Sequence, residues 1–156
     1  QKTAYEMLRS LVGSEMCIRD RRTPYDQISA AYGALMAARR GEFKSCAERL
    51  QPLMAALAAG GAAFSLYQEF TLLFSARALL DSDQFGGRGR EALRLLAEKG
   101  RFCRVPAVIA LARVAAGEAE RDQVRALAAL VMREQPEQTG LLEDEIVKFA
   151  GQSGRG

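Results

Sequence analysis

The stretch from Pro106 to Gln135 constrains the fold more than any other part of the chain. Its sequence, PAVIALARVAAGEAERDQVRALAALVMREQ, holds two segments with apolar residues at three- and four-residue spacing, separated at Gly117. Spacing of this kind is typical of amphipathic helices. The first segment is apolar on nearly every side, so a helix formed by it must be surrounded by other elements. We therefore predict a hairpin of two helices against which the remaining chain packs.

Helical spacing also runs through the rest of the chain from Pro24 onward. Pro24 and Pro106 suit the first turn of a helix, because that turn leaves its backbone N–H groups unpaired in any case. Glycines that follow several of the segments are typical helix terminators. No segment shows the alternation typical of a strand. We therefore expect an all-α chain with helices at about residues 24–40, 43–59, 65–80, 90–99, 106–116, 121–134 and 139–150.

Three local features add to this expectation. Pro52 falls inside the second helix, where it removes one hydrogen bond, so we expect a kink or a restart there. The segment Asp81–Gly89, DSDQFGGRG, is expected to form a loop, because three glycines with Ser and Asp favour irregular backbone. In the third helix an aromatic stripe at helical spacing is expected to face the core. Leu66, Phe70, Leu73 and Leu80 recur along this stripe, and Tyr67 and Phe74 widen it. A pocket for an apolar ligand lined by Tyr67, Phe70 and Phe74 is the alternative.

The predicted hairpins resemble tetratricopeptide repeats. Gly41-Glu42-Phe43 is similar to the turn of that motif, Leu111 and Ala112 stand where its two helices touch, and Pro136 takes the place of its closing proline. The middle hairpin matches by length only and needs an insertion, and no Trp is present. Over residues 24–136 the resemblance implies antiparallel helical hairpins in a right-handed tetratricopeptide-like α-solenoid of about seven helices. An irregular helical bundle is the alternative.

Residues 1–21 fit no structural pattern, but they match a nucleotide pattern. QKTAYE resembles the translation of a sequencing flow-cell primer, and LVGSEMCIRD resembles that of a transposase adaptor, in the correct order and frame. We interpret residues 1–21 as a non-native, adaptor-derived segment and exclude them from the fold. A native N-terminus, with any leader or upstream domain, would then be missing from this fragment. Residues 22–150 are expected to form a single helical-repeat domain, and residues 151–156 a disordered tail.

Composition disfavours several classes of protein. Without residues 1–21 the chain holds 18 basic and 16 acidic residues, and a net charge of about +2 is too modest for a dedicated nucleic-acid-binding protein. The chain has no His, and Cys46 and Cys103 stand in no metal-binding spacing. No apolar run reaches the roughly 18 residues of a membrane span. We expect a cytoplasmic protein without metal, cofactor or membrane association.

The sequence offers little that could carry catalysis. The run Phe85–Arg90 faintly suggests a phosphate-binding loop, since glycines allow close backbone approach before a helix N-terminus, but a surface loop is the simpler interpretation. Carboxylates near the C-terminal end fall on an outer helix face rather than in a cleft. Neither cysteine has a histidine to act as its base, and Cys46 is expected to pack in the core. We therefore assign no catalytic, cofactor-binding or metal-binding residue.

The absence of a catalytic constellation favours a noncatalytic helical-repeat module that mediates protein–protein interaction. Such a module would bind another protein or a peptide in a groove lined by the first helices of its hairpins. Amphipathic aromatic residues give contact area together with a hydrogen bond, so the candidate anchors are Tyr25, Tyr32 and Tyr67. Three further candidates concentrate positive charge around the fourth helix: Arg88, Arg90 and Arg94.

Other functions remain open. One alternative is a helical ligand-binding or dimerisation domain of a bacterial transcriptional regulator whose DNA-binding part lay upstream. Another is a helical appendage of a larger enzyme, because helix pairs of this length occur in many unrelated proteins. Association of identical chains is compatible with each of these functions, whereas nucleic acid is the less favoured partner.

Overall fold

The computed structural model describes residues 24–60, 64–138, 140 and 142–144. Its helices are α2 (Pro24–Arg39), α3 (Phe43–Ala58), α4 (Leu66–Leu79), α5 (Gly86–Lys99), α6 (Arg104–Val114), α7 (Glu118–Glu134) and the short 3-10 helix η1 (Pro136–Gln138). No strand occurs among these described residues, so the predicted all-α class is confirmed. The proposed adaptor-derived segment 1–21, the tail 151–156 and most of the helix expected at 139–150 lie outside the described residues.

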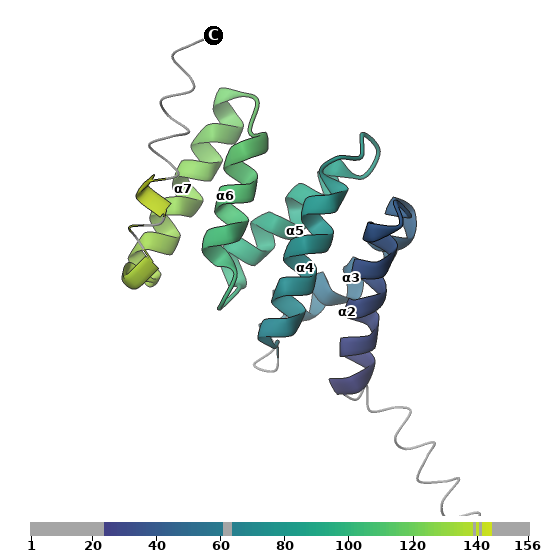
Figure 1. Cartoon of the computed structure of the whole chain (residues 1–156). Coiled ribbons are helices and arrows are strands. Elements are labelled where there is room, and N and C mark those ends of the chain that lie inside the picture. Colours follow the sequence, from purple (N-terminus) through teal and green to yellow (C-terminus); the bar gives the residue numbers. More distant parts are fainter. Residues whose placement is uncertain (1–23, 61–63, 139, 141, 145–156) are drawn as a thin grey trace, which may run out of the picture.

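The helices pair into three antiparallel hairpins: α2 with α3, α4 with α5, and α6 with α7. Neighbouring hairpins pack together in chain order, since α2 and α3 contact α4 and α5, and α5 in turn contacts α6 and α7. Figure 1 shows α2, α4 and α6 side by side, with the three hairpin turns at the same end of the molecule. The first helices of the hairpins therefore form one face, and α3 and α5 lie behind it.

Buried positions recur along these helices. In the first helices, corresponding residues lie 38 and then 36 residues apart, and buried sets at this separation are Ala34, Leu72 and Val108, and Ala38, Ala76 and Ala112. In the second helices the separations are 43 and 31, and the buried sets are Leu50, Leu93 and Val124, and Met54, Ala97 and Ala128. The two helix series differ because the connection between α4 and α5 is longer than the other two hairpin turns. The middle hairpin therefore has the longest turn of the three.

Local sequence explains where several helices begin and end. Gly41 and Gly60 follow α2 and α3 with φ angles of 73° and 70°, a left-handed conformation that glycine adopts without steric cost. The Ser65 side chain accepts a hydrogen bond from the backbone N–H of Gln68, whose side chain accepts one from the Ser65 N–H. This reciprocal cap starts α4. Pro52 lies inside α3, which continues through it as one helix to Ala58, so the expected restart does not occur.

Helix α5 begins at Gly86, and the predicted loop Asp81–Gly89 is therefore wrong over its last four residues. The reason is close packing against α4. A Cβ atom on Gly89 would lie 2.6 Å from the carbonyl oxygen of Ala76, so only glycine lets the two backbones approach this closely. The glycines that indicated a loop, and faintly a phosphate-binding turn, instead form the first turn of a packed helix.

None of the helices in the described part of the chain combines the length and the apolar character needed to cross a membrane.

Candidate interaction surface

Helix α4 turns its aromatic side to solvent. Leu66, Tyr67, Phe70 and Phe74 recur at helical spacing along one side, and each side chain is between 43% and 48% exposed. The expectation that this stripe faces the core was wrong for these four residues, whereas Leu73 is buried and Leu80 is partly buried against the core. The buried side of the helix instead combines apolar and polar residues: Gln68, Glu69, Thr71, Leu72, Leu73, Ser75, Ala76 and Leu79.

Hydrogen bonds account for the burial of this polar side. Glu69 is only 1% exposed, and its carboxylate accepts hydrogen bonds from three consecutive backbone N–H groups, at 2.7 Å from Arg101 and at 2.8 Å from Phe102 and Cys103. A buried carboxylate is tolerated when its oxygens are satisfied in this way. Gly100 lies next to Glu69, and only glycine leaves room there. A Cβ atom at this position would lie 3.1 Å from a Glu69 carboxylate oxygen and 2.5 Å from the Leu96 carbonyl oxygen. Rolling α4 to bury its aromatic residues would break these bonds.

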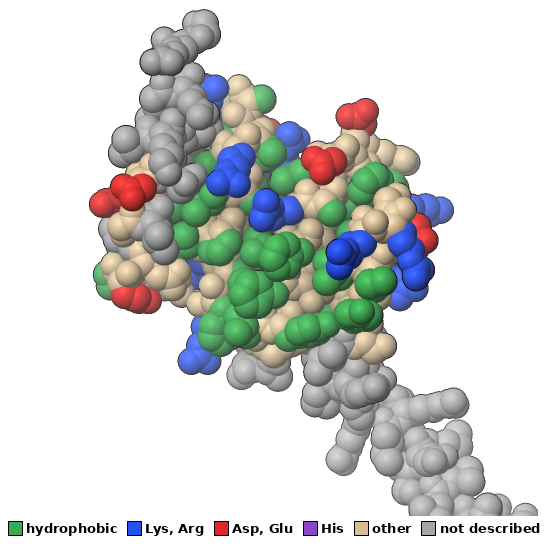
Figure 2. Space-filling view, viewed as in Figure 1, with side chains coloured by type: hydrophobic (Ala, Val, Ile, Leu, Met, Phe, Trp, Pro, Cys, Tyr) green, Lys and Arg blue, Asp and Glu red, His purple; other side chains and the backbone are tan. Residues whose placement is uncertain are grey.

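The exposed residues of α4 belong to a larger surface, which we call the aromatic face. It consists of the exposed large hydrophobic side chains among the described residues: Tyr32, Leu66, Tyr67, Phe70, Phe74 and Phe102. These residues come from α2, α4 and the turn between α5 and α6. Figure 2 shows hydrophobic side chains gathered over the middle and lower part of the face formed by α2, α4 and α6. Contiguous apolar surface of this kind is typical of interaction sites.

Two contacts order the rings of the aromatic face. The rings of Phe70 and Phe74 stack along α4 with centroids 6.1 Å apart and planes inclined by 15°. The Arg101 guanidinium lies over the Phe102 ring, 5.3 Å from its centroid. Because Glu69 accepts a hydrogen bond from the Phe102 N–H, the same buried carboxylate fixes the backbone that carries this ring.

The turn between α5 and α6 is held from the side of α7 as well. The buried Arg104 side chain donates to the carbonyl oxygen of Ala97 at 2.7 Å and to the Glu134 carboxylate at the end of α7. The hydrogen bond from Arg104, and then its charge, lowers the pKa of Glu134 below its ordinary value. The Gln135 side chain donates to the carbonyl oxygen of Arg101 at 2.8 Å. Phe102 therefore stands on a turn that is braced by α4, α5 and the end of α7.

The predicted tyrosine anchors fall on the first helices of the hairpins. Tyr32 of α2 is 53% exposed, and Tyr67 is exposed at the start of α4. Tyr25 lies in the first turn of α2, but its side chain is outside the described residues. Sequence reasoning missed Phe70, Phe74 and Phe102 as surface residues. The signal available was the second stripe of α4, where Gln68, Thr71 and Ser75 are spaced like the aromatic residues.

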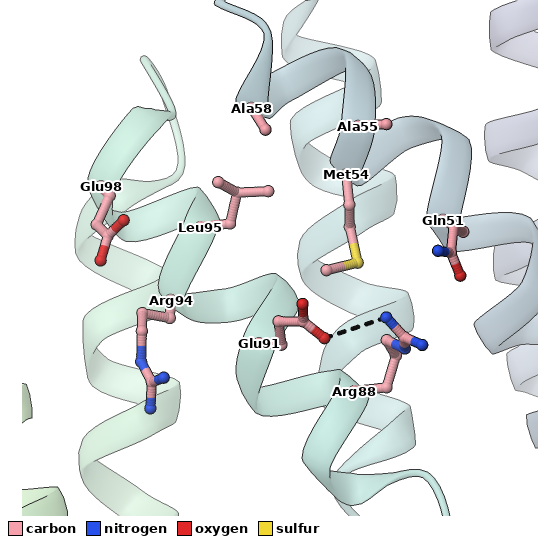
Figure 3. Close-up of a pocket in the computed structure, with 9 residues that line it drawn as sticks. All are labelled: Gln51, Met54, Ala55, Ala58, Arg88, Glu91, Arg94, Leu95 and Glu98. Carbon is pink, nitrogen blue, oxygen red and sulfur yellow. Dashed lines mark hydrogen bonds and ion pairs between the residues drawn. The ribbon is translucent and has the colours of Figure 1, made fainter.

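The predicted arginines lie apart from the aromatic face, on α5. Arg88 and Arg94 line a groove of about 400 Å³ between α3 and α5, with Met54 and Leu95 among its apolar residues. Figure 3 shows Arg88 next to Glu91, to which it donates a hydrogen bond at 3.2 Å. Arg94 donates to the Gln123 side chain of α7, at 2.9 Å. The remaining candidate, Arg90, lines a smaller crevice toward α6 and α7.

The acidic residues and cysteines of the described part of the chain were the remaining candidates for a chemical site. No three side chains among their Cys, Asp and Glu residues gather so that they could hold a metal ion. Cys46 is buried as predicted, and burial raises the pKa of its thiol. Burial, with a smaller effect of the Glu69 charge, raises the pKa of the Cys103 thiol to about 11. Both thiols therefore stay protonated near neutral pH and are poor nucleophiles.

No protein-family model matches this chain, and neither curated proteins nor solved structures show a similarity that would indicate a relationship.

Proposed function

We propose that this chain is a noncatalytic helical-repeat module that binds another protein through its aromatic face. The observation that carries the proposal is the orientation of α4. This helix buries Gln68, Glu69, Thr71 and Ser75 while four large apolar residues stay exposed on its other side. An ordinary core helix has the reverse arrangement, because burial of apolar surface is the main favourable term in folding.

The hydrogen bonds between Glu69 and the turn before α6 argue against an accidental orientation of α4. Three charge-assisted hydrogen bonds from backbone N–H groups hold the carboxylate, and each such bond is worth roughly 1.5–3 kcal/mol. Together they stabilise the orientation in which the aromatic residues of α4 stay in water. A binding role explains that exposure, because large apolar and aromatic side chains supply most of the affinity at protein interfaces.

We further propose that the hairpins form a right-handed tetratricopeptide-like α-solenoid. The support is the recurrence of buried positions at 38 and 36 residues in the first helices, somewhat longer than the 34-residue tetratricopeptide period. The packing of neighbouring hairpins in chain order supports it too. In such a solenoid α2, α4 and α6 would line the surface that receives the partner. Tyr32 and Tyr67 would then anchor the partner together with Phe70, Phe74 and Phe102, whereas Arg88, Arg90 and Arg94 would lie outside the site.

Affinity capture with the full chain tests the interaction proposal. One variant carries Tyr32→Ala, Tyr67→Ala and Phe70→Ala on the aromatic face. A matched control variant carries Gln51→Ala, Arg88→Ala and Leu95→Ala in the groove between α3 and α5. Proteins retained by the parent chain and by the control variant, but lost from the aromatic-face variant, are the expected result. Circular dichroism of each variant verifies that the helices are intact.

Two other outcomes would contradict the proposal. Equal capture by all three chains would show that the aromatic face binds nothing in the mixture. Loss of helical signal in the aromatic-face variant alone would show that its residues support the fold. If sedimentation of the parent chain shows a dimer that the aromatic-face variant abolishes, the dimerisation-domain alternative is favoured instead.

A further inference from the structure

The exposed charges of the first helices are all positive among the side chains that the structure describes. Arg39, Arg77 and Arg113 are exposed and stand in the last turns of α2, α4 and α6, at the same separations of 38 and 36 residues as the buried positions. Among the side chains described on these helices, the acidic one is Glu69, which is buried. Exposed carboxylates instead occur on the second helices, as at Glu48, Glu91, Glu98, Glu118 and Asp122, and in the turns after α2 and α4, at Glu42, Asp81 and Asp83.

This positive charge lies beside the aromatic face. Arg77 follows Phe74 by three residues on α4, which places both on one side of the helix. Arg39 follows Tyr32 by two helical turns on α2, and Arg101 lies over Phe102. Figure 2 shows basic side chains directly beside the hydrophobic patch, with acidic side chains farther out, toward the upper, left and right edges of the view. The surface therefore combines aromatic side chains with a cationic border.

We infer that the occupant of this surface is a short acidic amphipathic helix of another protein. The inference rests on the proposed function and specifies its partner class. Leu66, Phe70 and Phe74 project at four-residue intervals over about 12 Å of α4, a ridge that fits the apolar stripe of a partner helix of two to three turns. Carboxylates flanking that stripe would meet Arg39 and Arg77. Such charge complementarity speeds association and selects against basic partners.

The observations favour this occupant over single-stranded nucleic acid. Stacking sites for bases need a free ring face, and the stacking of Phe70 with Phe74 occupies one face of each ring. The net charge of the whole chain is +3, which gives little attraction for a phosphate backbone. Binding of nucleic acid is therefore the alternative that the experiment must exclude.

The test is a peptide display selection on the full chain with random segments of about 16 residues, long enough for the proposed helix. Selected peptides are then resynthesised with a fluorescent label, and binding is measured by anisotropy at low and high salt. The variants are Arg39→Glu with Arg77→Glu, which reverses the border charge, and Phe70→Ala with Phe74→Ala, which removes the stacked rings. Arg88→Glu in the groove between α3 and α5 is the control for charge reversal. A labelled oligouridine is measured in parallel.

The inference predicts selected peptides with two or more apolar residues at helical spacing and an excess of Asp and Glu. Reversal of Arg39 and Arg77 is expected to weaken their binding at least about tenfold, with Arg88→Glu close to the parent chain. Higher salt is expected to weaken binding to the parent chain.

The outcomes separate the two proposals. Neutral or basic peptides that are lost from the Phe70 and Phe74 variant would overturn the acidic helix but keep the interaction module. Absence of any enriched peptide would contradict both. Tighter binding of oligouridine than of every peptide would replace the protein partner with nucleic acid, and peptides insensitive to either pair of substitutions would place binding elsewhere on the chain.

Discussion

At the scale of single residues, Glu69 does the most to set the character of the surface. It lies on the buried side of α4 between two exposed apolar neighbours in the helix, Leu66 and Phe70, and its carboxylate accepts hydrogen bonds from three N–H groups of the turn before α6. The sequence could predict the aromatic residues and their spacing. It could not predict which side of α4 faces inward, because the partners of Glu69 are more than thirty residues away.

Replacement of this carboxylate by its amide tests the junction. Glu69→Gln keeps the size of the side chain but removes its charge and one of its acceptor oxygens, so a buried N–H group loses its partner. The free energy of unfolding is expected to fall by about 2 kcal/mol or more, measured by urea denaturation. Glu91→Gln is the control, since the ion pair of Glu91 with Arg88 is exposed and is expected to contribute less than about 1 kcal/mol. Equal effects of the two substitutions would refute the role of Glu69.

The pair of Arg104 with Glu134 predicts a pH dependence. Because the folded-state pKa of Glu134 is lowered, its contribution to stability is present above the ordinary carboxyl pKa of 4.5 and is lost as the pH falls through the lowered value. Glu134→Gln is therefore expected to destabilise the protein near pH 7, with the difference from the parent chain shrinking toward about pH 3. Urea denaturation across that range measures it, with Glu48→Gln as control. A difference that stays constant with pH would disprove the coupling.

At the scale of helices, sequence patterns could predict most elements but not all of their packing. The ends of α2, α3 and α7 follow from Gly41, Gly60 and Pro136, which act locally. The start of α5 could not be predicted, because the glycines before Arg90 are helical only where α4 lies against them. Propensity favours a loop there, and tertiary contact overrides it.

Gly89 and Gly87 of α5 allow a matched test of this explanation. Gly89→Ala is expected to cost about 1–3 kcal/mol, because its new Cβ would press on the Ala76 carbonyl oxygen. Gly87→Ala, at a position open to solvent, is expected to be neutral or to stabilise by up to about 1 kcal/mol, since alanine is the better helix former. Thermal denaturation of both variants decides the matter. A similar effect at the two positions would show that α5 does not pack on α4 as described.

At the scale of the whole molecule, three hairpins place α2, α4 and α6 side by side, with aromatic and cationic side chains on the face they form. The hairpins could be predicted from helix lengths and short turns. The sequence could not predict which face is exposed, because hydropathy alone assigns aromatic residues to a core. In this structure many of the buried residues of α2 and α6 are alanines and valines. These side chains fill the interior without the aromatic rings of α4.

The central claim is that the aromatic residues of α4 lie on the surface of the fold and do not belong to its core. The most direct test is the free energy of unfolding of the Phe70→Ala, Phe74→Ala double variant, with Leu72→Ala on the buried side of α4 as control. Leu72→Ala is expected to cost about 2–5 kcal/mol. The double variant is expected to cost about 1.5–3 kcal/mol for both rings together, because each ring is already about half exposed. A loss of about 6 kcal/mol or more would place both rings in the core and contradict the account.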